Sequence, residues 1–547
     1  MPLVDPNESF DVAARHLFRH LGDARQLSRN PLVRRFFGSD EPERFTPAKE
    51  RAALTLVREL VVRATERYWG ATPESSVPRE AAYRRHTIVM SHCLEGRLLG
   101  EVAAELGISI RQCYRERSDA MHRIAEYVGS YEDCQRTDVL PLLDAFHLRM
   151  DRAACRAEVG DLDQALRDFD HIVAADPSRE HKIEALCKRA ETSLDCGDFQ
   201  ACEAAIARAW DLARMGSLAP DAAAETRIHL VESKLCWSTG RFDDDSRALE
   251  GSLHSIEPIL LGADDRVKEL HAEILLEFCG RYRTRGEFAH AHERLLGVEA
   301  TLASVRVPTP QRRFDAMMES WSLGAKHVQF EGAGTKRLSR YESLVELAAL
   351  ARSFTSPKRS IRLAEAFMQY HADAGDQVSA WDWARRAVGL AEELANRQLL
   401  ADVQLVLADW ISVTPQKALA ARLLQSAEGK FPKGGPDWIL LHGLQAEYAL
   451  QTHQYGEAIA RATEVERAIE RMGNVRFQAA ARTTIALAAH ALGKRREANE
   501  QVHSALEVID DYGTPWTRLS TYRAAATITG DRRHRRRLRE IGRSLRV

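Results

Sequence analysis

The sequence predicts an all-α protein in which a compact helical head precedes a long array of helix pairs. Glycine and proline, with 31 and 18 residues, make up about 9% of the 547-residue chain, below the roughly 12% of average proteins. Apolar residues recur with the helical spacing i, i+3, i+4 and i+7 between turn signals. Hydrophobic residues at 45% and charged residues at 29% are typical of a globular chain and argue against a largely disordered one.

The head is expected to cover residues 1–130. Its apolar spacing predicts helices at 9–21, 47–69, 79–94, 98–106 and 110–127. Thr46 and Pro47 form a favourable helix start, with threonine as the cap and proline in the first turn. We expect residues 131–141 to link the head to the array.

From residue 142 to 547 the sequence repeats a pattern of two helices separated by glycine. The first unit has Ala153, Gly160, Ala165, Phe169 and Pro177 at its characteristic positions. Small residues let antiparallel helices approach closely, and glycine supplies the left-handed conformation between them. This pattern resembles the tetratricopeptide repeat, which implies an α-solenoid with a concave binding surface.

The frame recurs along the array, and the recurrence is more specific than any single unit. Further units have Ala190, Gly197, Ile206 and Ala209; Ser233, Gly240 and Leu249; Cys279, Gly286, Ala291 and Leu295; Met368, Gly375, Ala380 and Ala384; Ala446, His453, Ala458 and Ala462; and Ala486, Gly493, Ala498 and Val502. A weaker unit has Ala408, Ala420 and Leu424 with Pro415 in place of glycine, and a last unit is expected near Gly530. The pattern gives no boundaries between 300 and 357, where the array can be interrupted.

One segment of the head carries a second pattern. Residues 94–117 read LEGRLLGEVAAELGISIRQCYRER. A short helix is expected to end at Gly107, with Ser109 as the cap of the next helix and Ala103 at the crossing. The apolar seam between the two helices is predicted to consist of Val102, Leu106, Ile108 and Cys113.

This segment, within about 79–127, resembles the helix-turn-helix of region four of bacterial sigma factors and of response-regulator-type activators. The resemblance implies a bacterial transcription regulator whose second helix enters the major groove of double-stranded DNA. Residues implied to contact bases or adjacent phosphates are Ser109, Arg111, Gln112, Tyr114 and Arg115. Arginines expected at the phosphate backbone are Arg84, Arg85, Arg97, Arg117 and Arg123.

An alternative stays open, because Glu101, Glu105 and Glu116 would repel phosphate if they faced it. The motif would then be degenerate and would dock a protein, and the chain would be a tetratricopeptide scaffold that binds no DNA. In either case we expect the solenoid groove to hold a peptide, protein or small-molecule effector. A homodimer is expected from the usual two-fold symmetry of such regulators.

Other function classes are not indicated by the sequence. It has no recognisable catalytic motif, phosphate-binding loop or metal-ligand cluster, so we expect no enzyme activity, cofactor or metal. The net charge is −2, and the sequence has neither a long apolar run nor a start resembling a signal peptide. We therefore expect a cytoplasmic protein without membrane contact.

Two further features have structural interpretations. The nine cysteines form no C-x-x-C pair and are expected to be reduced packing residues. Residues 532–546 hold eight arginines against Glu540. The last helix of a solenoid must present a polar outer face, which accounts for this composition without a ligand. The alternative is a basic tail that binds nucleic acid or an acidic partner.

Overall fold

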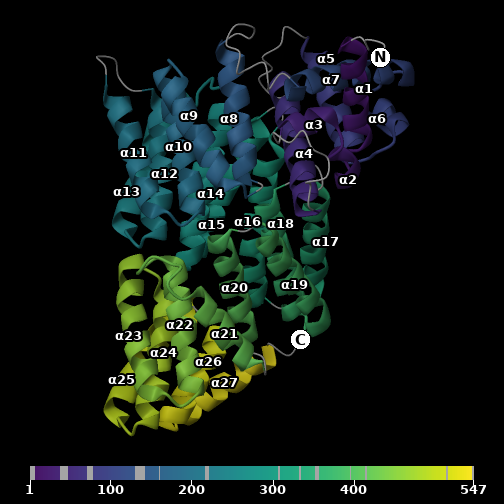
Figure 1. Ribbon diagram of the computed structural model, residues 1–547. Helices are drawn as coiled ribbons and strands as arrows, with labels where there is room; N and C mark the ends of the chain where they lie inside the picture. The colour runs from purple at the N-terminus through teal and green to yellow at the C-terminus, as the bar shows by residue number, and fades with distance from the viewer. Residues whose placement is uncertain are drawn as a thin grey trace.

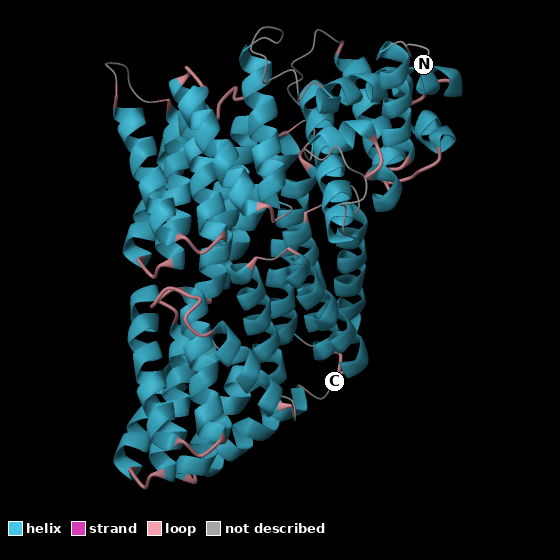
Figure 2. Ribbon diagram, in the orientation of Figure 1, coloured by secondary structure: helices cyan, strands magenta, loops and turns pink. Residues whose placement is uncertain are grey.

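A computed structural model shows a helical protein with a head beside a two-tiered array of helix pairs (Figure 1). The structure describes residues 6–36, 47–69, 78–129, 142–158, 160–215, 221–305, 308–331, 334–351, 356–394, 396–412, 416–512 and 515–544. Within these ranges all regular elements are helices (Figure 2). The all-α prediction is therefore confirmed for the part of the chain that is described.

The head contains seven α-helices and one π-helical segment among its described residues. They are α1 (Pro6–Arg19), α2 (Ala24–Leu27), α3 (Pro31–Phe36), α4 (Pro47–Trp69), α5 (Arg79–Thr87), η2 (Ile88–Leu94), α6 (Leu99–Glu105) and α7 (Ile110–Gly129). Helix α4 has the predicted bounds, and the helix predicted at 79–94 is divided into α5 and η2. The short helices α2 and α3 were not predicted. Thr46 and the linker 131–141 lie outside the described residues.

The first tier of the array is made of α8–α19. Its helices are α8 (Leu142–Glu158), α9 (Leu162–Ala175), α10 (Arg179–Asp195), α11 (Phe199–Arg214), α12 (Ala222–Ser238), α13 (Phe242–Ile256), α14 (Asp265–Arg285), α15 (Phe288–Ser304), α16 (Pro310–Glu331), α17 (Gly334–Leu350), α18 (Pro357–Asp373) and α19 (Gln377–Glu393). A short 3₁₀ turn, η4 (Glu257–Ile259), follows α13.

The second tier is made of α20–α27, of which α22–α27 lie below α8–α15 in Figure 1. Its helices are α20 (Arg397–Ser412), α21 (Lys417–Ala427), α22 (Pro436–Gln451), α23 (Tyr455–Met472), α24 (Val475–Ala491), α25 (Arg495–Tyr512), α26 (Pro515–Thr529) and α27 (Arg532–Ser544). Every predicted unit is a helix pair. The region 300–357, in which no boundaries were predicted, holds one more pair, α16 and α17.

The repeat positions have the predicted packing role. The small residues at the helix crossings are buried, among them Ala153, Ala190, Ser233, Cys279, Ala446 and Ala486. The turn glycines of the units have φ between +71° and +86°, and His453, which replaces glycine in its unit, has φ of 64°. Close helix approach and a left-handed turn therefore define the pairs, as the sequence pattern indicates. Pro415 lies outside the described residues.

The turns of the first tier rest on those of the second. Asn396 Nδ2, before α20, donates a hydrogen bond to the carbonyl of Asp195 at 3.2 Å. Asn474 Nδ2, before α24, donates one to the carbonyl of Thr284. At Gly240 the two backbones are so close that a Cβ there would lie 2.4 Å from the carbonyl oxygen of Gly434. The array thus folds back on itself through backbone contacts between turns.

The head and the array share one apolar core. Ala120, Ile124 and Tyr127 of α7 belong to the same buried cluster as Phe314 of α16 and Phe367 of α18. Polar contacts reinforce this junction: Arg67 lies 3.1 Å from the carboxylate of Asp151 on α8. The C-terminal half of α7 is therefore fixed against the array.

Two negative findings concern the described residues only. Among them no helix combines the length and the apolar character needed to span a bilayer. Seven of the cysteines are free thiols, namely Cys93, Cys113, Cys187, Cys196, Cys202, Cys236 and Cys279.

We expect Gly240→Ala to destabilise the protein more than Gly493→Ala. Both glycines have nearly the same positive φ, +75° and +76°, but no atom lies within 4 Å of a Cβ at Gly493. Gly493→Ala should cost only the left-handed strain, about 1–2 kcal/mol. Gly240→Ala adds a clash with backbone, on the order of 1–3 kcal/mol more. Urea unfolding followed by circular dichroism measures both, and equal losses would show that the tiers do not press together at Gly240.

Candidate functional site

Helices α6 and α7 of the head are joined by a short turn and pack against each other. Ser109 caps α7, since its Oγ accepts a hydrogen bond from the backbone N–H of Gln112 at 3.2 Å. The seam between α6 and α7 is apolar and includes Val102, Ala103 and Cys113, all buried. These contacts confirm the predicted packing of α6 against α7. They do not test whether α7 binds nucleic acid.

The N-terminal half of α7 is open to solvent. Arg111, Tyr114 and Arg115 are exposed, and Gln112 is half-buried. Among the described residues, neither Arg111 nor Arg115 has an ion-pair partner. The first two turns of α7 therefore present two unpaired guanidinium groups and an aromatic ring on one accessible surface.

The other predicted arginines are engaged within the head. Arg84 and Arg85 bind the carboxylate of Glu116 at 3.2 and 2.7 Å, and Glu116 is only 7% exposed. Glu116 thus points into the head, away from the exposed surface of α7. Arg85 also lies 3.2 Å from the carboxylate of Asp119. For Arg84 and Arg85 to bind phosphate, they would have to exchange these partners.

Three further arginines are also held by neighbouring side chains. Arg97 lies 2.9 Å from the carboxylate of Glu105. Arg117 contacts His92 Nε2 at 3.1 Å and lies over the ring of Tyr114. The guanidinium of Arg123 lies 4.7 Å from the ring centre of Tyr68. Each of these contacts stabilises the head itself.

A charged cavity of about 560 Å³ occupies the inner side of the first tier. All its lining residues come from the first helix of a pair, namely α8, α10, α12, α14, α16 or α18. The lining is Glu158, Lys188, Glu191, Leu194, Asp195, Lys234, Glu273, Leu276, Glu277, Gly280, Arg281, Arg283, Arg312, Asp315, Glu319, Lys358, Arg359 and Arg362. Eight of these side chains are basic and seven acidic, so the cavity is nearly neutral as a whole.

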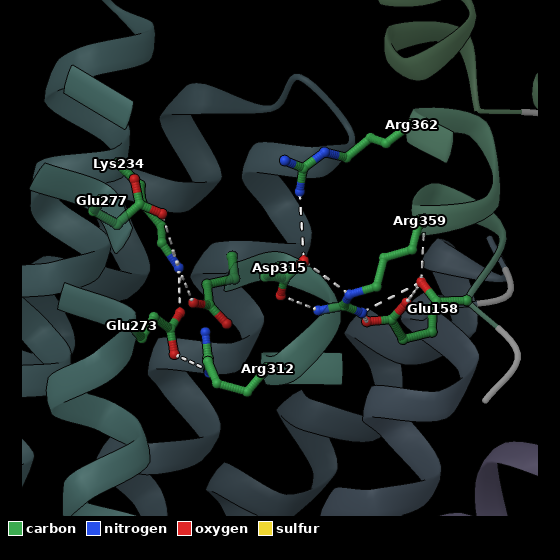
Figure 3. Close-up of polar contacts among 10 residues, drawn as sticks. Glu158, Lys234, Glu273, Glu277, Arg312, Asp315, Arg359 and Arg362 are labelled. Carbon is green, nitrogen blue, oxygen red and sulfur yellow. Dashed lines mark hydrogen bonds and ion pairs between the residues drawn. The ribbon is translucent and has the colours of Figure 1, made fainter. Parts of the chain in front are cut away.

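Lys234 of α12 is the centre of one ion-pair network in this cavity (Figure 3). Its Nζ lies 2.9 Å from Glu191 Oε1 on α10 and 2.8 Å from Glu273 Oε1 on α14. Arg312 of α16 binds the other oxygen of Glu273 at 2.7 Å. Four successive inner helices are therefore joined by charge-assisted hydrogen bonds.

Neighbouring charges dominate the ionisation of this network. Burial alone would raise the pKa of Glu191, but Lys188 and Lys234 outweigh it and lower that pKa to about 2. For Glu273, the attraction of Arg312 and Lys234 likewise overcomes burial, and its pKa lies well below the ordinary value. Both carboxylates are therefore ionised at neutral pH.

A second network closes the first tier (Figure 3). Arg359 of α18 lies between two carboxylates, at 2.8 Å from Asp315 on α16 and 3.4 Å from Glu158 on α8. Lys358 pairs with Asp195 on α10. Since α18 is five pairs after α8, these contacts join the two ends of the tier into a ring around the cavity.

The sequence prediction missed every charged residue of this cavity. One signal was present: Glu191, Lys234 and Gly280 each directly follow the small residue of their unit. A position next to the crossing residue in the first helix faces the inside of a solenoid. Charged residues there look like ordinary surface residues until the helices are placed.

Comparisons with known proteins support a tetratricopeptide-like repeat array and give no evidence for a helix-turn-helix regulator. No family model matches the sequence. A stretch of 142 residues is 32% identical to human tetratricopeptide repeat protein 34 and covers 24% of each protein. The chain thus spans about a quarter of the length of this curated relative. Together with the helix pairs and their turn conformations, this similarity makes the array tetratricopeptide-like.

Solved structures are similar only at low levels. The anaphase-promoting complex subunits Cut9–Hcn1 match 89% of this chain and 99% of the other, with 14% identity and a TM-score of 0.34. The match to a signal-transduction ATPase with a tetratricopeptide sensor from Pyrococcus horikoshii covers 99% of this chain and 72% of the other, with 11% identity and a TM-score of 0.34. The match to human IFIT1 with m7Gppp-AAAA covers 82% of this chain and 100% of the other, with 12% identity and a TM-score of 0.35. Such TM-scores establish no shared fold, and none of these names indicates a helix-turn-helix regulator.

We expect Lys234→Met to destabilise the protein by about 3–5 kcal/mol at pH 7, because it leaves Glu191 and Glu273 without their shared cation in a half-buried site. The loss should shrink as the pH falls below about 4.5, where protonation of the carboxyls relieves their repulsion. In the wild type, depressed carboxyl pKa values mean that this stabilisation is present above about pH 4.5 and disappears toward pH 2. Urea unfolding at several pH values measures both profiles.

Arg247→Met is the matched control for this experiment. Arg247 also pairs with a carboxylate, Asp244, but its side chain is 77% exposed. Its replacement should change stability by no more than about 0.5 kcal/mol. Similar losses for Lys234→Met and Arg247→Met would contradict a structural role for the inner network.

Proposed function

We propose that this protein is a binding scaffold rather than an enzyme, and that the charged cavity of the first tier holds an extended segment of a partner protein. The observation that carries the proposal is the cavity itself, whose lining is drawn from six successive inner helices. A solenoid of this kind presents a long concave surface to an extended chain.

The balance of charges favours a protein partner over nucleic acid at this cavity. A phosphate backbone is bound by an excess of Lys and Arg, whereas this lining has eight basic and seven acidic side chains. In a polypeptide with alternating charges, the acidic side chains can pair with the basic residues of the lining and the basic side chains with its acidic residues. Complementary charges of this type increase specificity and the rate of association more than affinity.

Two rim residues offer the first contacts to such a segment. The side chain of Lys188 is 46% exposed and that of Arg362 is 47% exposed. Both have acidic partners, Glu191 and Asp315, which a bound peptide would share. Their heads reach water, so charge reversal at these two positions alters the rim of the cavity. Because Lys188 also lowers the pKa of Glu191, the stability of the variant is measured by urea unfolding beside its binding.

The double variant Lys188→Glu/Arg362→Glu should weaken binding of a mixed-charge peptide by at least about tenfold. The assay is fluorescence polarisation with labelled peptides of about twelve residues that are of mixed charge, all basic, all acidic or uncharged. We expect the wild type to prefer the mixed-charge set, with affinity falling as salt rises.

The control is Arg167→Glu/Arg208→Glu, which makes the same charge change on the exposed second helices α9 and α11. It should bind like the wild type. Equal binding of all four peptide classes, or no difference between the two double variants, would refute the cavity as the partner site.

A second candidate function is contact with double-stranded DNA through α7, in a transcription regulator. It is favoured by the exposed Arg111 and Arg115 beside the capped start of this helix, which have no ion-pair partner among the described residues. Such a helix end supplies both backbone N–H groups and long donors to phosphates and base edges. The apolar contacts that fix α7 to the array leave this end uncovered.

If α7 binds DNA, Arg111→Ala/Arg115→Ala should weaken binding of genomic duplex fragments and reduce its salt dependence by about two units of slope. Electrophoretic mobility shifts at several salt concentrations measure this. Arg495→Ala/Arg496→Ala removes two arginines from the distant helix α25 and is the control. Identical affinities of the two double variants would leave α7 without a role in nucleic-acid binding.

A further inference from the structure

The second tier has its own concave surface, and its chemistry is the opposite of the first. A groove of about 560 Å³ lies between the inner helices α22, α24 and α26, with α23 behind them. Its walls include the apolar side chains of Leu440, Leu444, Leu450, Val465, Phe477 and Leu487. The three inner helices lie side by side in the lower part of Figure 1.

Glu447 of α22 is the unusual member of this lining. It is half-buried, and within the described residues no hydrogen bond or ion pair engages its carboxyl group. Burial, with a smaller contribution from Asp409, raises the pKa of Glu447 to about 7. An ionisable group is rarely kept in an apolar wall without a partner, since its charge must be compensated.

The charged groups around Glu447 can be named from each wall. Asp409 of α20 and Arg523 of α26 also line the groove, and both are exposed. The lining residues from α23 and α24 are not ionisable; Thr483 and Thr484 are the polar ones that α24 contributes. The wall formed by α20 and α22 is therefore acidic, and an occupant there gains from a positive charge.

The size of the groove restricts the occupant. Small-molecule sites of about 300–1,000 Å³ are typically apolar with a few placed polar groups. The groove, at about 560 Å³, has the volume and the lining of such a site.

We propose that this groove is a binding site for a small apolar amine, whose alkyl or aromatic body lies between α22, α24 and α26 and whose ammonium group pairs with Glu447. The ammonium would supply the counter-charge that the carboxyl lacks. Asp409 adds to the negative potential at the same wall, and Arg523 lies on α26 across the groove. This site is separate from the charged cavity and does not depend on what that cavity binds.

The test is isothermal titration of the full-length protein with n-decylamine, below its aggregation concentration, at pH 8. Decanoate and 1-decanol, which have the same chain length, are the comparators. We expect decylamine to bind at least about tenfold more tightly than decanol, and decanoate to bind most weakly. Between pH 6 and 8 the amine stays protonated while Glu447 ionises, so its affinity should rise, by up to about tenfold.

Glu447→Gln keeps the shape of the side chain and should remove the preference for amine over alcohol together with the pH dependence. Glu470→Gln, on the exposed surface of α23, removes one carboxylate elsewhere and should change neither. Ala480→Phe fills the groove from α24 and should abolish binding of all three probes. Lys188→Glu/Arg362→Glu should leave decylamine binding unchanged, which separates this site from the cavity of the first tier.

Three results would overturn the proposal. The first is equal affinity for decylamine and decanol in the wild type, and the second is full retention of amine binding by Glu447→Gln. The third is no binding of any decyl probe while a basic amphipathic helical peptide binds in a manner sensitive to Ala480→Phe, which would make the groove a protein-docking surface.

Discussion

The close approach of paired helices at small residues is the constraint on which this structure depends. Ala153, Ala190 and Ser233 are fully buried at successive crossings, and a larger side chain at any of them would push its pair apart. Because the small residues recur at the same position in most pairs, the first helices of these pairs line the inner surfaces of both tiers. The inner surfaces of both tiers follow from this repetition.

The two inner surfaces differ because their side chains meet the cost of burial in different ways. In the first tier, attraction from Lys234 lowers the pKa of Glu191 and keeps it charged. In the second tier, burial raises the pKa of Glu447 to about 7. By linkage, the lowered pKa of Glu191 stabilises the fold at neutral pH, and this stabilisation is lost in acid. The raised pKa of Glu447 has the opposite effect. Its contribution to stability is fully present below about pH 4.5 and is lost as the pH rises through 7. One array thus contains two environments of opposite acid response.

Local patterns in the sequence predict most of the helices. Turn glycines such as Gly240 and Gly286 and crossing residues such as Cys279 mark the pairs because their roles are set within about 40 residues. The same holds for the cap at Ser109. The pair α16–α17 escapes this reasoning because the sequence shows no glycine-marked unit between 300 and 357, and Phe314 of α16 packs against the head.

Contacts between distant segments were not predictable in this way. The ion pairs of Lys234 and Arg359 each join three helices, and Asn474 contacts a turn almost 200 residues earlier. Such pairings depend on the curvature of the array, which small rotations at every helix crossing determine together. For a charged residue on an amphipathic helix, the neighbouring sequence does not indicate whether the side chain faces water or another charged side chain.

The shared core of head and array, in which Ile124 and Phe314 belong to one cluster, has a consequence for how this protein can evolve. A recombination breakpoint near residue 130 would expose apolar surface on both products, so neither portion could be exchanged among genes as a ready-made module. Substitutions at this boundary therefore have to be compatible with the apolar surfaces of both portions at once.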